Sequence, residues 1–114
     1  MLESEIQRQI VDWIRYVAPE CMVIAIPNAA RRTASGRASN AVPGLTAGAP
    51  DLLVIRPRGE VLWMEVKTDK GKPTPLQMKF HENLQIRNHA CAIVRSLDDA
   101  RNAFKAVGIE TRER

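Results

Sequence analysis

The stretch "GAPDLLVIRPRGEVLWMEVK", residues 48–67, decides the fold because it predicts a β-hairpin with charged side chains inside its strands. Its two arms, residues 51–55 and 61–67, are rich in the branched and aromatic side chains that favour strands. Between the arms, "PRG" is typical of a three-residue loop, with Pro57 at the first corner and Gly59 at the left-handed position. Charges within strands are costly unless they are paired or bound, so the charged residues of the arms are candidates for a site.

The loop length fixes which residues face each other across the hairpin. Counting outward from a three-residue loop places Asp51 opposite Glu65, with Cβ atoms about 5 Å apart. Lys67 lies two residues beyond Glu65 and therefore on the same face of the strand. A two-residue loop would instead place Asp51 opposite Val66, and the charges would meet only with a bulge. The turn chemistry thus predicts that Asp51, Glu65 and Lys67 come together.

Two carboxylates at this separation repel each other strongly unless a cation neutralises them. Mg²⁺ or Mn²⁺ suits the pair, because hard divalent ions prefer carboxylate and carbonyl oxygens and retain several waters. The backbone carbonyl of Val66, between the two charged side chains of the second arm, is a further candidate ligand. An ion pair between Lys67 and one carboxylate, with no metal, is the alternative explanation of the same spacing.

Hydrophobic periodicity predicts three helices and two further strands around the hairpin. Apolar residues recur at helical spacing near the N-terminus, so residues 3–17 are expected to form an amphipathic helix. The other expected elements are a strand at 22–26, a helix at 76–87 behind Pro75, a strand at 91–94 and a helix at 97–107. Ser96 suits the N-cap of the last helix and Gly108 its end, and residues 111–114 are expected to fray.

This order, α-β-β-β-α-β-α, predicts an α/β fold with a small mixed sheet flanked by helices. The length of 114 residues suits a single domain, residues 1–114. No segment approaches the apolar length that spans a bilayer, and the N-terminus lacks the apolar core of a signal peptide, so a cytoplasmic protein is expected. Cys21 and Cys91 are expected to be reduced thiols, and with His81 and His89 they form no zinc-binding pattern.

A long segment rich in Ala, Gly, Ser and Thr, residues 27–50, precedes the hairpin. Loops of this length inside a small domain are usually functional or disordered. It contains no acidic residue, and basic residues flank the acidic site on both sides. These are Arg31, Arg32 and Arg37 in the loop, and Lys70, Lys72 and Lys79 after the hairpin. A basic flank beside an acidic site indicates a polyanionic substrate, whereas a solvated basic surface without a ligand is the alternative.

Two short motifs of the hairpin resemble those of a known nuclease superfamily. "PD" (residues 50–51) and "EVK" (residues 65–67), fourteen positions from aspartate to glutamate, resemble the PD-(D/E)xK motif. A wider similarity runs through "ESEIQRQIVDWI", "GAPDLLVI", "WMEVKTDKGKPTPLQ" and "AIVRSLDDA". Over nearly its whole length, the chain therefore resembles the VRR-NUC (virus-type replication-repair nuclease) family, in particular stand-alone members of the kind found in phages. The resemblance implies a restriction-endonuclease-like core.

The resemblance also implies roles for individual residues. Asp51 and Glu65 would be metal ligands, and Lys67 would orient the attacking water and stabilise the developing phosphorane charge. Gln77 would line the site from the helix that follows the motif. A glutamate of the first helix usually completes such sites, and this would be Glu5, with Glu3 as the less favoured choice.

His81 follows Gln77 by one helical turn. It would be either a helix-surface histidine or a proton shuttle that reaches the site.

The function implied by the resemblance is a Mg²⁺- or Mn²⁺-dependent DNA endonuclease. Stand-alone members resemble Holliday-junction resolvases in fold, which implies a homodimer with two active sites that cuts branched DNA. In that case Arg31, Arg32, Arg37, Lys70 and Lys72 would contact DNA phosphates. One alternative is a flap- or nick-directed nuclease of phage replication or repair. The other is a non-catalytic DNA-binding module of the same fold.

Overall fold

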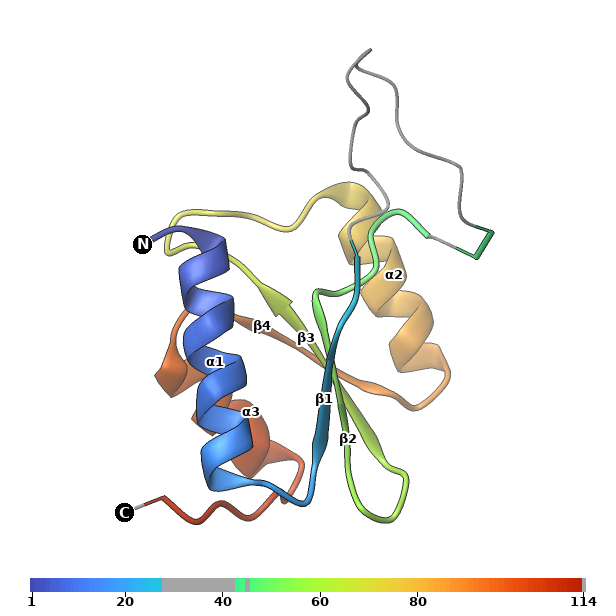
Figure 1. Cartoon of the computed structure of the whole chain (residues 1–114). Coiled ribbons are helices and arrows are strands. Elements are labelled where there is room, and N and C mark those ends of the chain that lie inside the picture. The colour runs from blue at the N-terminus through green and yellow to red at the C-terminus, as the bar shows by residue number, and fades with distance from the viewer. Residues whose placement is uncertain (28–42, 45, 114) are drawn as a thin grey trace.

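The computed structural model describes residues 1–27, 43–44 and 46–113. Within them, three helices and four strands follow the order α-β-β-β-α-β-α (Figure 1), which confirms the predicted α/β fold. The helices are α1 (Glu3–Val17), α2 (Pro75–Ile86) and α3 (Leu97–Ala106). The strands are β1 (Met22–Ala25), β2 (Leu52–Ile55), β3 (Val61–Val66) and β4 (Ala90–Val94). The predicted bounds differ from these by one residue at most at any end.

The strands form one mixed sheet in the order β1-β2-β3-β4. The first two pairings are antiparallel, and β3 pairs with β4 in parallel, with α2 as the crossover between them. In the hairpin, Ile55 pairs with Val61 and Leu53 with Trp63, which confirms the register predicted from the three-residue loop. Gly59 has a φ of +95°, as the left-handed loop position requires.

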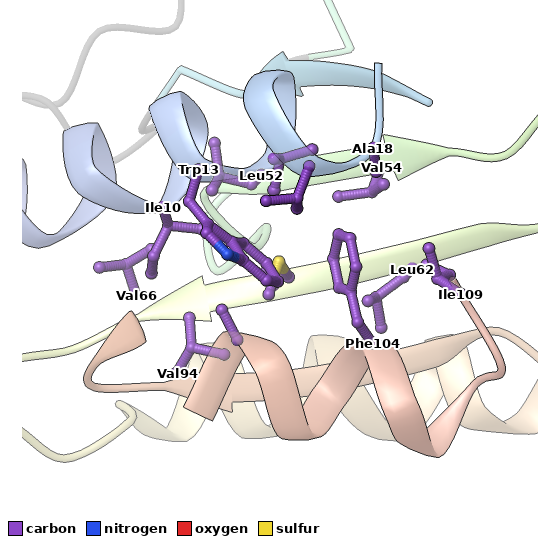
Figure 2. Close-up of a cluster of buried hydrophobic side chains, with 14 of the residues drawn as sticks. Ile10, Trp13, Ala18, Leu52, Val54, Leu62, Val66, Val94, Phe104 and Ile109 are labelled. Atoms are coloured by element: carbon purple, nitrogen blue, oxygen red, sulfur yellow. The ribbon is translucent and has the colours of Figure 1, made fainter. Parts of the chain in front are cut away.

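The sheet has a helix layer on each face, with α1 and α3 on one side and α2 on the other (Figure 1). Strand alternation sends Leu62, Met64 and Val66 of β3 toward α1 and α3, where all three are buried. Figure 2 shows this cluster, in which side chains from both helices and the sheet pack together. Phe104 of α3 is fully buried, and its ring lies 4.9 Å from the ring of Trp13, centroid to centroid.

The residues after α3 are held against the body of the protein. Gly108, with a φ of +76°, ends the helix and turns the chain so that Ile109 is buried. The Arg112 amide then donates a hydrogen bond to the Val17 carbonyl at 2.7 Å, and the Glu113 carboxylate binds Arg101 at 2.6 Å. The expectation that this tail frays is therefore wrong for residues 111–113, because the end of α1 and the side of α3 offer it partners.

No helix in the part of the chain that the structure describes is long and apolar enough to cross a membrane.

Candidate active site

Asp51 and Glu65 lie next to each other at the open end of the hairpin, opposite its loop. Asp51 directly precedes β2, and its Oδ2 atom accepts a hydrogen bond from the Val66 amide at 2.7 Å. Continuing the pairing of Leu52 with Met64 by one residue brings Asp51 beside Glu65. The Asp51 carboxyl group lies close enough to Glu65 to raise the pKa of Glu65. The structure therefore brings together the two carboxylates that the turn chemistry predicted to meet.

The Glu65 side chain lies inside the protein, with 1% of the residue exposed. Burial raises the pKa of Glu65 to about 9, with further contributions from the hydrogen bond to Asp51 and the Asp51 charge, while the Lys67 charge opposes the shift. At neutral pH and without a cation, Glu65 therefore keeps a proton. A divalent cation between the carboxyl groups would replace that proton, so the two residues fit a metal site.

Lys67 continues the line of β3 by one residue, because its amide donates to the Val94 carbonyl at 3.0 Å. The residue is buried, with 8% exposed, and its charge lowers the pKa of both Glu65 and His81. The Lys67 charge therefore acts on the same group of side chains as Glu65 and His81. Lys67 thus lies on the same face of the sheet as Glu65, close enough for its charge to act on that carboxyl group.

Two side chains from the first two turns of α2 contact the Glu65 carboxyl group. Gln77 Nε2 donates to Glu65 Oε2 at 3.3 Å, and His81 Nε2 lies 3.3 Å from Glu65 Oε1. The spacing of four residues places both side chains on one side of the helix, so each reaches a different oxygen. Burial and the Lys67 charge lower the pKa of His81, so this contact joins two neutral groups rather than an ion pair.

Gln77 is itself fixed by the N-terminal cap of α2. Its Oε1 accepts a hydrogen bond from the Thr74 amide at 2.8 Å, and Thr74 Oγ1 accepts one from the Gln77 amide at 3.2 Å. This capping box leaves the amide nitrogen of Gln77 aimed at Glu65. The pattern "TPLQ" contains the signal for this cap, whereas the contact of His81 was visible only as its spacing from Gln77.

Gly48 is a site-building residue that the sequence did not single out. Its φ is +87°, and a Cβ atom at this position would lie 2.6 Å from the Leu76 carbonyl oxygen. The backbone before Asp51 therefore packs directly on the first turn of α2, one residue before Gln77. This contact joins the segment that carries Asp51 to the helix that carries Gln77 and His81.

The two candidate glutamates of α1 are placed differently. Glu5 Oε2 accepts a hydrogen bond from the Leu2 amide at 3.2 Å and so caps the first turn of its own helix. Glu3 is the residue of α1 whose charge raises the pKa of Glu65. Of the two glutamates, Glu3, the less favoured choice from sequence, is thus the one whose charge acts on Glu65.

The basic residues divide into two groups. Lys70 and Lys72 are exposed in the connection between β3 and α2, close in sequence to Lys67. The remaining candidates for DNA contact, Arg31, Arg32 and Arg37, lie outside the described residues.

Trp63 lies two residues before Glu65 on β3 and on the same face of the sheet. Its ring lies 6.2 Å from that of Phe80, centroid to centroid, and its Nε1 donates to His89 Nδ1 at 2.9 Å. This partner of His89 was not evident from sequence. Cys91 of β4 is the backbone pairing partner of Trp63 in β3. Its side chain is a free thiol, and burial raises the pKa of that thiol to about 12.

Comparisons with known proteins identify the family and support the fold. The family model described as "VRR-NUC domain" matches residues 2–98. A solved structure described as "VRR_NUC domain" superposes with a TM-score of 0.63 at 28% sequence identity, covering 90% of this chain and 94% of that one.

Among curated proteins, "Putative nuclease p44" of Acyrthosiphon pisum secondary endosymbiont phage 1 is 37% identical over 51 residues. The match covers 45% of this chain and 55% of that protein, so the chain spans about half of the relative's length. The family match extends over most of the sequence, includes both carboxylates, Lys67 and Gln77, and agrees with the observed fold. The chain therefore belongs to the VRR-NUC family of nucleases.

Proposed function

We propose that this protein is a metal-dependent endonuclease that hydrolyses DNA phosphodiester bonds. The observation that carries the proposal is the buried Glu65 carboxyl group, whose pKa responds to Asp51 across the hairpin and to the Lys67 charge. Burying one carboxyl group next to a second one is unfavourable for a purely structural purpose. The arrangement is favourable when a cation is bound between them.

The donor set suits Mg²⁺ or Mn²⁺. The hydrogen bond from the Val66 amide to Asp51 places the amide on the Asp51 side of β3, and the carbonyl of a strand residue points to the same side as its amide. Asp51, Glu65 and the Val66 carbonyl would then hold the ion. These three ligands would leave several coordination positions for water and substrate.

The residues around the carboxyl groups divide the remaining tasks. A bound divalent ion supplies positive charge to the phosphate oxygens and acidifies a nearby water. Gln77 and His81 keep the Glu65 carboxyl group in one orientation, since each contacts one of its oxygens. Lys67 orients the attacking water and stabilises the negative charge that develops on the phosphate.

For the substrate, we propose branched DNA, cut symmetrically by a homodimer. A single domain of 114 residues offers little surface for holding a four-way junction, whereas two copies present two active sites to opposite strands. Exposed Lys70 and Lys72 would contact phosphates next to the site, and Arg31, Arg32 and Arg37 would contribute further phosphate contacts.

The test compares the wild type with Glu65→Ala on labelled four-way junction, flap and duplex DNA, each in Mg²⁺, Mn²⁺ or EDTA. Glu60→Gln is the matched control, because this exposed glutamate lies on the same hairpin at the loop end. We expect paired symmetric cuts in the junction that require metal, are absent in Glu65→Ala and persist in Glu60→Gln. Sedimentation with and without junction reports whether two copies act together.

Other outcomes would change the proposal in defined ways. Cleavage confined to flaps or nicks would retain the chemistry and replace the branched substrate and the dimer. Tight DNA binding that is unaffected by EDTA, without cleavage in any metal, would reject the enzyme and leave a DNA-binding module.

A further inference from the structure

The connection between β3 and α2 leaves the sheet directly after the candidate catalytic lysine. The Lys67 amide still pairs with the Val94 carbonyl at 3.0 Å, and the following residues belong to neither a strand nor a helix until Pro75. Lys70 and Lys72 are exposed on this connection. Its conformation therefore decides where two positive charges lie relative to the site.

One side chain of the neighbouring strand end binds this connection. Arg95 follows β4 directly, and its Nη1 donates to the Thr68 carbonyl at 2.7 Å, to the Asp69 carbonyl at 3.4 Å and to the Gly71 carbonyl. The Gly71 amide donates to the Thr68 carbonyl at 3.1 Å, which closes a turn around the guanidinium. Three carbonyls of residues 68–71 thus converge on one cation.

Arg95 is fixed on its own side as well. Its backbone amide donates to Asp99 Oδ2 at 2.9 Å, from the first turn of α3. The side chain therefore links the end of β4 and the start of α3 to the turn at 68–71. Carbonyl oxygens directed at one point repel each other, and the charged Arg95 Nη1 group offsets this repulsion with its two N–H donors, which the three carbonyls share.

An ordered connection favours binding of a polyanion. Fixing a backbone residue costs about 1–2 kcal/mol in conformational entropy, and a segment that is ordered before binding does not lose this entropy when the ligand arrives. Lys70 and Lys72 would then meet phosphates with little rearrangement. Arg95 itself is partly buried and occupied by the carbonyls, so it is not among the groups that would contact DNA.

We propose that Arg95 is a positioning residue that holds residues 68–72 as a rigid arm, from which Lys70 and Lys72 bind DNA phosphates beside Lys67. The proposal rests on the DNA-binding function inferred above. It assigns Arg95 an effect on DNA affinity, through the geometry of the arm, and none on the turnover of bound DNA.

The first experiment compares Arg95→Lys and Arg95→Gln with Arg101→Gln. Arg101 is a matched control, since it lies on α3 and pairs with Asp98 and Glu113. Hydrogen exchange reports the arm directly, without DNA or catalysis. We expect faster exchange of the amides of 68–72 in both Arg95 variants and unchanged exchange there in Arg101→Gln. Unchanged exchange in a folded Arg95 variant would overturn the proposal, and Arg95→Lys serves if Arg95→Gln does not fold.

The second experiment measures the affinity for labelled duplex DNA in EDTA. We expect about fivefold weaker binding in both Arg95 variants, although Arg95→Lys retains the charge, with kcat at saturating DNA within about twofold of wild type. Full affinity in Arg95→Lys would show that charge rather than geometry matters, and a loss confined to kcat would place Arg95 in the chemistry. Either result would overturn the proposal.

A double-mutant cycle with Lys70→Gln/Lys72→Gln tests whether Arg95 acts through these two lysines. We expect the combined variant to bind DNA no more weakly than Lys70→Gln/Lys72→Gln alone, to within about twofold, and fully additive losses would contradict the proposal. If the arm loosens in the Arg95 variants but the wild type cleaves no DNA, the proposed nuclease function fails and the role of Arg95 in ordering the arm remains.

Discussion

The two faces of the sheet are made from alternate residues of the same strands, yet they differ in what packs on them. On the face toward α1 and α3, β3 contributes Leu62, Met64 and Val66, and α1 adds five buried apolar residues. On the face toward α2, the same strand contributes Trp63 and Glu65, followed by Lys67. The helix that covers this face, α2, has one fully buried residue, Leu84.

Alternate residues of β3 thus serve two purposes: one set packs in the apolar core, and the other set contributes to the candidate active site. The α1/α3 face can fill its volume with apolar side chains because nothing there has to react. The α2 face holds its helix partly through the hydrogen bond that Gln77 donates to Glu65 and the contact between His81 and Glu65. A helix attached in this way responds to the state of the carboxyl group beneath it, so α2 is expected to be the less stable layer.

Truncating one phenylalanine on each face should give the largest effect on stability. Phe104→Ala removes a fully buried ring that packs on Trp13, and we expect a loss of about 3–5 kcal/mol in the free energy of unfolding. Phe80→Ala removes a half-buried ring beside Trp63, with an expected loss of about 1–2 kcal/mol. Urea unfolding measures both.

Nuclease activity should be affected in the opposite order, with the larger loss in Phe80→Ala than in Phe104→Ala. Per folded molecule, Phe104→Ala should retain activity and Phe80→Ala should lose it, because Phe80 lies between Gln77 and His81 along α2. Equal stability losses in the two variants would show that the faces are not divided as described.

The pH dependence of stability should give the next largest effect, and it isolates Glu65. The folded pKa of Glu65 is raised to about 9 from 4.5, so the folded protein holds a proton there that the unfolded chain releases. The contribution of Glu65 is therefore fully present below pH 4.5 and is lost as pH rises toward 9. At pH 7 without metal, keeping this proton costs about 3 kcal/mol relative to acid pH.

Glu65→Gln cannot release a proton and should not show this decline. In EDTA we expect it to exceed the wild type in stability by about 1–3 kcal/mol at pH 7, with the difference shrinking toward pH 4.5. Thermal unfolding across this pH range, with Glu60→Gln as the control, makes the measurement. A constant difference between wild type and Glu65→Gln at all pH values would refute the buried, protonated carboxyl group.

The sequence predicted the apolar face and the hairpin more completely than the α2 side of the site. The "PRG" loop sufficed for the register that brings Asp51 to Glu65, because hairpin pairing follows from turn length alone. Periodicity sufficed for α1, whose apolar stripe is unbroken. Both are local features, determined by residues close together in the chain.

Contacts between segments that are far apart in the chain could not be predicted from local sequence patterns. The contact of His81 with Glu65 depends on the tilt of α2 over β3, and the choice between Glu3 and Glu5 depends on how α1 lies beside the hairpin. The anchoring of residues 68–71 by Arg95 joins segments 24 to 27 residues apart. No periodic pattern in the sequence encodes such contacts, although each uses a residue type suited to it.

Gly48 offers the smallest and most specific test, because it connects the hairpin to α2. Gly48→Ala and Gly59→Ala both place a side chain at positive φ, which costs about 1–2 kcal/mol in either case. Only at position 48 would the new methyl group also meet the backbone of Leu76, at 2.6 Å from its carbonyl oxygen, whereas position 59 is open. We therefore expect Gly48→Ala to be less stable than Gly59→Ala by about 1 kcal/mol, in urea unfolding.

The activities of these two variants should differ more than their stabilities. Relief of the clash at position 48 moves the first turn of α2 away from the hairpin and draws Gln77 off the Glu65 carboxyl group. A displacement of this kind near reacting groups lowers cleavage by about tenfold to a hundredfold, measured per folded molecule, whereas Gly59→Ala should cleave as the wild type does. Equal cleavage by the two variants would mean that the α2 layer tolerates displacement, and that the site depends on the hairpin alone.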